Sequence, residues 1–498
     1  MRATLFRRMI AHLIPVAAMA AAFSCRAASL EKSDDLDIDW TNLVRVGALY
    51  QLNALPPVAT QYYCGSAVNC GGDSGFSQGR VDWLSAMSVT GRGFGLHASL
   101  EARKDEVADD ANYLQLFEAY ASGSIGTLGD RPLTVLIGRH SVIWGESLHF
   151  ASNAIAGAQS PIDSSERNFT LYDQSTRFLP VGQASFTWQM SSRFALVGYR
   201  QFEWRGNRVD PNDVYASEGD VLGTEATRMI LLPVPKYGPV PYWRADGTTP
   251  SSGDQFGLGM KWHVGAFDGG LYGLKFDAKT PVITYYREDR SFSLDYARGI
   301  GLLGISLTGP VAEETFSAEL SGRHHMPLVE GGLSNGDGDR GDGARGDTIH
   351  GQMSLTGEAA PRSFLPGGAT ANIEIAANHL IAVTDNRAQL LAGRTRTAAA
   401  LRGVFAPRFF QLLPRLDLSL PISAGYNFLG LSQVLPDMNR GTGDIGIGAA
   451  ATLDEGWTAT LSYTHYFGSN KTPVLTFNYG GQPMADWDHV GMSLQVSF

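Results

Sequence analysis

The sequence predicts an all-β protein, namely a transmembrane antiparallel β-barrel of the outer-membrane type with about 16 to 18 strands. Three observations support this prediction: an N-terminal export signal, a series of segments in which apolar and polar residues alternate, and a last strand that ends on Phe498. After the export signal, no apolar run is long enough for a spanning helix, which needs about 18 residues. The mean hydropathy of −0.09 also suits a soluble β protein, so the prediction depends on the strand pattern.

Residues 1–27 have the features of a signal peptide. Three arginines within the first eight residues precede the apolar stretch Met9–Phe23, which is too short to span a bilayer. Small residues at Cys25 and Ala27 suit a signal peptidase, and we expect cleavage after Ala27. Residues 28–39 then form a short N-terminal lead, and residues 40–498 form the barrel.

Cleavage after residue 27 leaves two cysteines, Cys64 and Cys70, in a Gly-rich stretch. Two cysteines this close in an exported protein predict a local disulfide. The following residues, CGGDSG, match the order around the nucleophilic serine of trypsin-like proteases. That chemistry needs a histidine earlier in the chain, and the only one before Ser74 is His12, which lies in the signal peptide. The sequence therefore predicts a loop closed by a disulfide here, and no protease.

The strand pattern favours a membrane barrel over a soluble sandwich. Eight segments alternate most clearly, and most of them are roughly 8 to 13 residues long, a length that suits tilted spanning strands. Lysine, histidine and glutamate occur on their polar faces, where a sandwich would have a packed core. Twelve weaker segments bring the candidates to about twenty, some of which we expect to be loops. The eight clearest segments are residues 256–264, 272–278, 316–321, 349–356, 416–428, 445–452, 457–464 and 490–498.

The polar faces of these strands define the expected lumen. Both signs of charge are present, and we expect most of these side chains to form structural pairs across strands. The predicted lumen-lining residues are Glu101, Arg103, Lys261, His263, Lys275, Asp277, Glu319, Arg323 and Glu374. Four long connections, residues 51–79, 145–182, 206–252 and 325–347, are expected on the extracellular side.

Two of these connections contain unusual sequences. Leu231–Trp243 reads LLPVPKYGPVPYW, and its four prolines argue against a central strand. It is either a loop packed on other loops or an apolar vestibule that receives a hydrophobic ligand. In the second case Trp243 would line the vestibule. Residues 332–347 are rich in Gly and Asp but lack the order of an EF-hand, which predicts a mobile loop tip and no metal site.

The stretch IGRHSVIWGES, residues 137–147, carries a family resemblance. Together with residues 160–163 (SPID) and 179–181 (LPV), it resembles the outer-membrane family catalogued as domain of unknown function 1302, over most of the mature chain. Four residues here, Arg139, Trp144, Glu146 and Asp163, are expected to anchor a loop folded into the lumen, with direct substrate contact as the alternative.

The resemblance implies a channel or facilitator for a small hydrophobic or amphipathic molecule in the outer membrane of a Gram-negative bacterium. A barrel that organises envelope components without conducting is the alternative. A barrel hydrolase would need a serine or an aspartate close to a histidine on adjacent strands, and the sequence identifies no such set. We therefore expect no enzyme, and we expect no cofactor. Removing four arginines with the signal makes the net charge −14, with no basic patch for nucleic acid. Expected partners are outer-membrane lipids, the barrel assembly machinery and, through the resemblance, an envelope export or lipid-handling system.

Overall fold

The computed structural model describes most of the chain after the predicted signal peptide. The described residues are 28–32, 35–54, 74–106, 112–127, 131–166, 178–209, 222, 227–234, 238–251, 253–286, 288–330, 333–334, 343–453, 456–468, 481–482, 484–485 and 487–498. The predicted signal peptide, Cys64 and Cys70 lie outside these residues.

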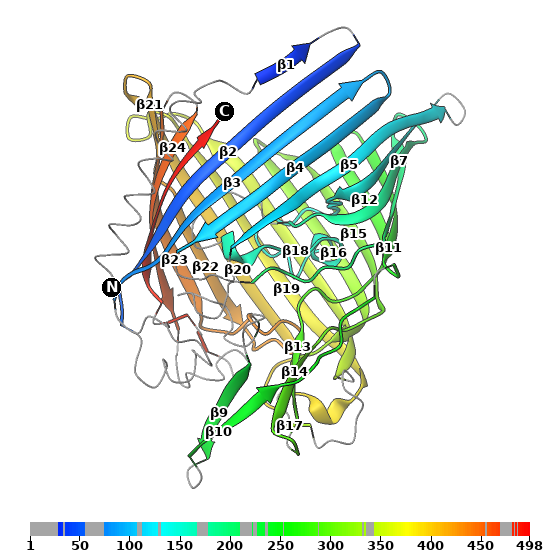
Figure 1. Cartoon of the computed structure of the whole chain (residues 1–498), viewed down its shortest axis with the longest axis vertical. Helices are drawn as coiled ribbons and strands as arrows, with labels where there is room; N and C mark the ends of the chain where they lie inside the picture. The colour runs from blue at the N-terminus through cyan, green and yellow to red at the C-terminus, as the bar shows by residue number, and fades with distance from the viewer. Residues whose placement is uncertain are drawn as a thin grey trace.

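The described chain forms a closed antiparallel β-barrel (Figure 1). The barrel closes where β25 pairs with β2, from Leu43 opposite Ser497 to Gln51 opposite His489. β21 and β22 pair with the same two neighbours and count as one strand, which gives 18 wall strands among the described residues. The predicted fold class and strand number are therefore confirmed.

The wall strands are β2 (Leu36–Gln51), β3 (Gly75–Gly91), β4 (Phe94–Asp105), β5 (Tyr113–Thr127), β6 (Pro132–His140), β7 (Val181–Gln189), β8 (Phe194–Gln201), β11 (Phe256–Val264), β12 (Phe267–Phe276), β15 (Ile300–Val311), β16 (Glu314–Pro327), β18 (Arg345–Ala359), β19 (Ala369–Asp385), β20 (Thr397–Leu413), β21 (Leu416–Ser419) with β22 (Ile422–Leu429), β23 (Gly443–Leu453), β24 (Trp457–Phe467) and β25 (His489–Ser497).

The two ends of the barrel differ in the length of their connections. Tight turns such as residues 92–93, 265–266 and 312–313 join strands at the end drawn at the top of Figure 1, which we call the short-turn end. The longer connections leave the wall at the opposite end, for example after β6 at His140 and after β8 at Gln201, and we call this the long-loop end. The first wall strand begins at Leu36, ahead of the predicted boundary at residue 40. The lead before it forms β1 (Ala28–Lys32), which pairs with β2.

A small five-stranded sheet lies beyond the long-loop end, at the bottom of Figure 1. It contains β9 (Arg228–Val234), β10 (Gly238–Arg244), β13 (Val282–Tyr286), β14 (Ser291–Asp295) and β17 (Leu333–Ser334). The proline-rich stretch predicted as a loop is the β9–β10 hairpin. Prolines are tolerated because β9 is the edge strand and β10 pairs with β14 only through Trp243 and Arg244.

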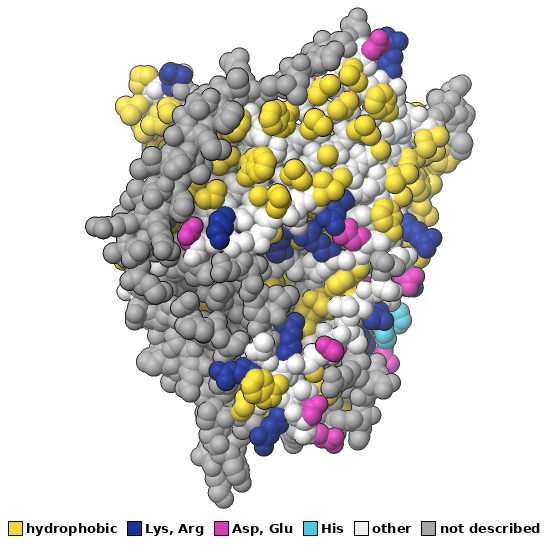
Figure 2. All heavy atoms as spheres, viewed as in Figure 1, with side chains coloured by type: hydrophobic (Ala, Val, Ile, Leu, Met, Phe, Trp, Pro, Cys, Tyr) yellow, Lys and Arg dark blue, Asp and Glu magenta, His cyan; other side chains and the backbone are white. Residues whose placement is uncertain are grey.

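The outer face of the wall is apolar over a broad band near the short-turn end (Figure 2). On β24, for example, Leu461 is 54% exposed while its neighbour Ser462 faces inward. Leu303 on β15 is 72% exposed and Ile447 on β23 is 53% exposed. Such a band is typical of the surface that a barrel presents to lipid. Among the described residues, no helix is long and apolar enough to cross a membrane.

Candidate functional site

The connection between β6 and β7 crosses the interior of the barrel. We call residues 141–166 the inserted segment; it includes the short helix α3 (Ala156–Gln159) and the 3-10 turn η2 (Ser164–Glu166). It leaves the wall at β6 but bonds to inner-face side chains of β16, β18 and β19, which are separated from β6 by β7, β8, β11, β12 and β15. Only a path through the lumen connects these points.

Glu319 on β16 receives two backbone N–H groups of the inserted segment. Its carboxylate accepts hydrogen bonds from the amide of Glu146 at 2.8 Å and from the amide of Ile155 at 2.9 Å. Gly145 permits this approach, because its φ is 92° and a Cβ there would overlap the Glu319 carboxylate. The Trp-Gly-Glu motif therefore needs its glycine to reach the wall.

A second carboxylate and a guanidinium hold the neighbouring part of the segment. Glu374 on β19 accepts from the amides of Leu148 at 3.1 Å, His149, and Phe150 at 3.3 Å. Arg323 on β16 donates to three successive carbonyls, residues 152–154, at 3.3, 2.7 and 2.9 Å. Buried backbone groups need partners, and here charged wall residues supply them in place of a sheet.

Asn153 connects the inserted segment to β18, the strand between β16 and β19. Its amide group donates to the side-chain oxygen of Gln352 on β18 at 3.2 Å, and its oxygen lies 2.9 Å from Nδ1 of His350. Both wall residues are buried. The inserted segment is thus bonded to three adjacent wall strands.

Apolar side chains fill the part of the lumen next to the start of the inserted segment. Trp144 is 5% exposed and stacks on Tyr272 of β12, with ring centroids 5.2 Å apart, and meets Tyr199 of β8 edge-on at the same distance. Leu274 and Phe276 lie on the same inner face of β12 as Tyr272. This half of the interior is therefore a packed core.

This packing corrects the predicted orientation of β12. Residues 272, 274 and 276 were expected to face lipid, with Lys275 in the lumen. Lys275 instead lies on the outer face, exposed, opposite Phe256 of β11. The rule that the apolar face points to lipid fails here because the apolar face of β12 points inward, where Tyr272 packs on Trp144.

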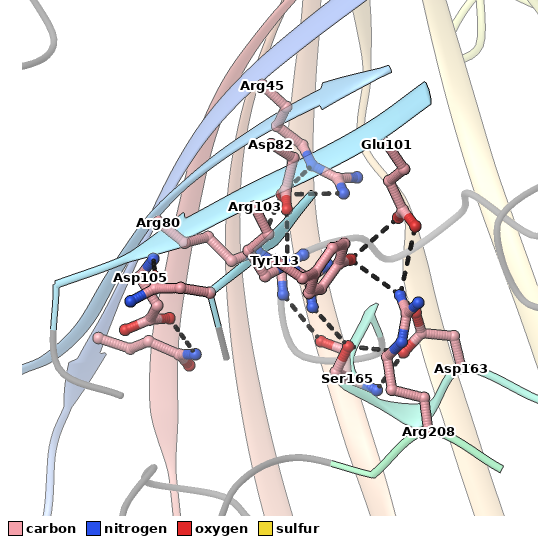
Figure 3. Close-up of polar contacts among 12 residues, drawn as sticks. Arg45, Arg80, Asp82, Glu101, Arg103, Asp105, Tyr113, Asp163, Ser165 and Arg208 are labelled. Carbon is pink, nitrogen blue, oxygen red and sulfur yellow. Dashed lines mark hydrogen bonds and ion pairs between the residues drawn. The ribbon is translucent and has the colours of Figure 1, made fainter. Parts of the chain in front are cut away.

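The end of the inserted segment bonds to the opposite part of the wall. Figure 3 shows Arg45, Arg80 and Arg103 converging on Asp82. Arg45, Asp82 and Arg103 are direct neighbours across β2, β3 and β4. Arg80 donates to the carbonyl of Ser165 at 3.0 Å, and Arg103 donates to its hydroxyl at 2.8 Å.

A second ionic group lies beside the first. Arg208 donates to Asp163 at 2.7 Å and to the Tyr113 hydroxyl at 2.8 Å, and it lies 3.5 Å from the Glu101 carboxylate (Figure 3). Asp163 also accepts from the amide and hydroxyl of Ser165. The segment is therefore held between β16–β19 on one side and β3–β5 on the other, and it spans the lumen.

The remaining predicted site residues lie elsewhere. Arg139 is on the outer face of β6 and pairs with Glu203, so it does not line the lumen. Lys261 and His263 lie on the inner face near the short-turn end, exposed, and His263 pairs with Asp268 at 2.8 Å. Asp277 follows the end of β12 and accepts from the amide of Gly299; it is not on the wall, because the strand ends at residue 276.

Trp243 and Glu146 differ in their surroundings. Trp243 is 54% exposed on β10, outside the barrel. The carboxyl of Glu146 lies in the lumen, where burial raises its pKa while the Lys261 ammonium opposes the rise. Among the described residues no cluster of three or more potential ligands could hold a metal ion.

Several site residues escaped the sequence prediction. Arg80 and Asp82 alternate with Val81 and Trp83, a signal that would have placed them inward. Arg45 lies in a strand that is apolar on both faces, and no alternation identifies it. Arg208 lies in a loop, so only the structure brings it to Asp163.

The wall formed by β22 to β25 is lined by small side chains. Ser462 faces inward on β24 between Gly448 and Gly491 of the adjoining strands, and Thr460 faces inward beside Ser493. The inner face here includes Ser423, Gly425, Gly446, Gly448, Ala450, Thr458, Thr460, Ser462, Thr464, Gly491 and Ser493, and its larger members are Asp444, His489 and Gln495. None of the contacts that hold the inserted segment comes from these strands in the described part of the chain.

The fold and the inserted segment define a barrel protein of the outer-membrane type with a loop across its lumen. The family model described as a protein of unknown function (DUF1302) matches residues 8–498, and the chain belongs to this family. No curated protein matches it.

Solved outer-membrane proteins are similar over nearly the whole chain. OccAB4 of Acinetobacter baumannii is 8% identical with a TM-score of 0.46, covering 94% of this chain and 99% of that one. The outer-membrane channel DcaP of the same species is 10% identical, with a TM-score of 0.41 and coverages of 95% and 100%. OccK2 of Pseudomonas aeruginosa, solved with glucuronate, is 11% identical, with a TM-score of 0.44 and coverages of 93% and 98%.

Proposed function

We propose that the protein is a passive channel or facilitator for a small hydrophobic or amphipathic molecule in the outer membrane of a Gram-negative bacterium. The short-turn end would face the periplasm and the long-loop end the exterior, the arrangement usual for such barrels. In this proposal the molecule passes beside the inserted segment, along the small-residue wall of β22 to β25. The proposal assigns no catalytic step and no cofactor.

The observation that carries the proposal is the uneven filling of the lumen. A barrel of 16 to 18 strands is wide enough to hold water, whereas about eight strands are filled by side chains alone. The inserted segment packs against β12 to β19, where Trp144 and the two carboxylates hold it. The wall from β22 to β25 carries glycine, serine and threonine inward.

An amphipathic substrate fits the chemistry of the two flanking walls. Three buried arginines, Arg45, Arg80 and Arg103, surround Asp82 on the β2–β4 side, where Asp105 lies opposite Arg80. Apolar residues gather near the long-loop end, where Val434, Leu435 and Met438 pack against Leu380 of β19. A molecule with one anionic and one apolar end would find both surfaces along its path.

The proposal extends to assembly and partners. Phe498 closes the barrel through backbone hydrogen bonds with Asn42 at 2.7 and 2.9 Å, and its terminal aromatic would be read by the barrel assembly machinery. The sequence resemblance implies an envelope export or lipid-handling system, which in this proposal would supply or receive the substrate.

Single-channel conductance in a planar lipid bilayer tests the proposal. The chain from residue 28 onward, refolded in detergent, should give stepwise conductance, and decanoate, an anionic amphipathic probe, should block it at concentrations where glucose does not. Equal effects of decanoate and glucose would argue against an amphipathic substrate. A folded barrel without conductance would contradict an open path.

The alternative is a non-conducting barrel that organises envelope components. One observation favours it: the inserted segment is bonded on both sides of the lumen through buried charges. Silence of the folded protein in the same bilayer, with no response to decanoate, is the result that this alternative predicts.

A further inference from the structure

A row of basic side chains crosses the outer face of five wall strands. Arg200 on β8 lies directly opposite Phe256 on β11, and Phe256 lies opposite Lys275 on β12. The row continues through Gly301 on β15 to His324 on β16. Since neighbouring strands are about 4.8 Å apart, the basic residues recur at about 10 Å, on every second strand.

The row marks the edge of the apolar band. Toward the short-turn end, the outward residues beneath it are Leu258, Leu271 and Leu303, which are 54%, 51% and 72% exposed. Phe256, in the row itself, is 51% exposed. Figure 2 shows a similar change along the face it presents: the hydrophobic band gives way, toward the long loops, to Lys and Arg side chains with Asp and Glu among them.

The arginine and the lysine of the row form no ion pair within the described residues. Arg200 donates only to the carbonyl of Gly253, at 3.4 Å, and Lys275 is exposed. The nearby carboxylates do not neutralise these two cations. Asp347 pairs with His324 at 2.7 Å, and the exposed Asp254 pairs with neither Arg200 nor Lys275. Arg200 and Lys275 therefore flank an exposed aromatic ring with their charges unneutralised.

We propose that Arg200, Phe256 and Lys275 form a binding site for the phosphorylated headgroup of an outer-leaflet lipid. Two cations about 10 Å apart suit a headgroup with two phosphates, and Phe256 between them would pack on the first carbons of its acyl chains. Gly301 leaves the wall without a side chain next to Lys275, which gives the headgroup access to that ammonium group. Charge complementarity at the edge of the apolar band selects a phospholipid-type occupant over a protein.

The inference uses the proposed membrane orientation, because only one end of the barrel would meet the outer leaflet. It does not depend on conduction. Lipid binding measured in detergent and conductance measured in a bilayer are separate readouts, so failure of one leaves the other interpretable.

Native mass spectrometry of the detergent-solubilised chain from residue 28 tests the site with diphosphoryl lipid A as the probe and phosphatidylethanolamine as the comparison lipid. We expect Arg200→Ser combined with Lys275→Ser to weaken binding of diphosphoryl lipid A at least tenfold and to leave phosphatidylethanolamine unchanged. Each single variant should lie between. Arg193→Ser, which removes an exposed arginine at the short-turn end of the same β7–β8 hairpin, is the matched control and should change binding less than twofold.

Two results would overturn the proposal. One is equal affinity of the double variant and the unchanged protein for diphosphoryl lipid A. The other is an equal loss of affinity for both lipids, which would show that the row does not distinguish a diphosphorylated headgroup from other lipid headgroups. Heat-modifiable migration on gels confirms that each variant is folded before its binding is compared.

Discussion

The hydrogen bonds at Glu374 predict a measurable loosening of the inserted segment when this side chain is removed. In Glu374→Ala, the amides of Leu148, His149 and Phe150 lose their acceptor. A hydrogen bond to a charged group contributes about 1.5 to 3 kcal/mol, and the bonds at 3.1 and 3.3 Å belong at the lower end. Allowing for water that replaces part of the loss, we expect local opening to become easier by about 3 kcal/mol, a factor of ~100.

Amide hydrogen exchange followed by mass spectrometry measures this directly. Exchange in a peptide covering residues 147–155 should accelerate about 100-fold in Glu374→Ala, and by less in Glu374→Gln, which keeps one acceptor oxygen. Glu358→Ala is the control, because this carboxylate is 69% exposed and pairs with Arg408 on the wall. An acceleration of less than about threefold in folded Glu374→Ala would refute the role of the wall carboxylate.

Two further predictions concern the segment and the loops beyond it. Gly145→Ala should weaken docking of the segment by about 1 to 3 kcal/mol, because φ is 92° and the new Cβ overlaps Glu319; unchanged exchange at residues 146–155 would contradict this. Burial raises the pKa of Glu330 to about 7 from 4.5, so the folded state keeps a proton that the unfolded chain has released. Stability should therefore fall by up to about 3 kcal/mol as pH rises from about 4.5 to 7. Glu330→Gln should remove this dependence in urea denaturation, and an identical pH profile in both proteins would exclude Glu330 as its source.

The alternation of apolar and polar residues predicts the barrel because successive side chains of a strand point to opposite faces, and each side chain on the outer face must be apolar to contact lipid. In β24, Leu461 and Tyr463 face outward while Ser462 faces inward, as the pattern predicts. The same rule reverses β12, where Tyr272 packs on Trp144. In sequence, a strand whose apolar face packs inside the barrel looks the same as one whose apolar face meets lipid.

The charged site is predictable only in part for a related reason. Alternation indicates that Glu319 and Glu374 face inward, but their partners are backbone amides of a segment many strands away. Which amides reach them depends on the path of the segment through the lumen, including the positive φ of Gly145. Local sequence patterns do not describe that path.

The single-channel conductance of two adjacent tryptophan variants on β24 tests the central claim, a path along the small-residue wall. Ser462→Trp places a large ring between Gly448 and Gly491 on the inner face, whereas Leu461→Trp places the same ring on the lipid face. The account predicts that Ser462→Trp lowers the unit conductance by half or more and that Leu461→Trp leaves it unchanged. Equal conductance in the two folded variants would contradict a path along this wall.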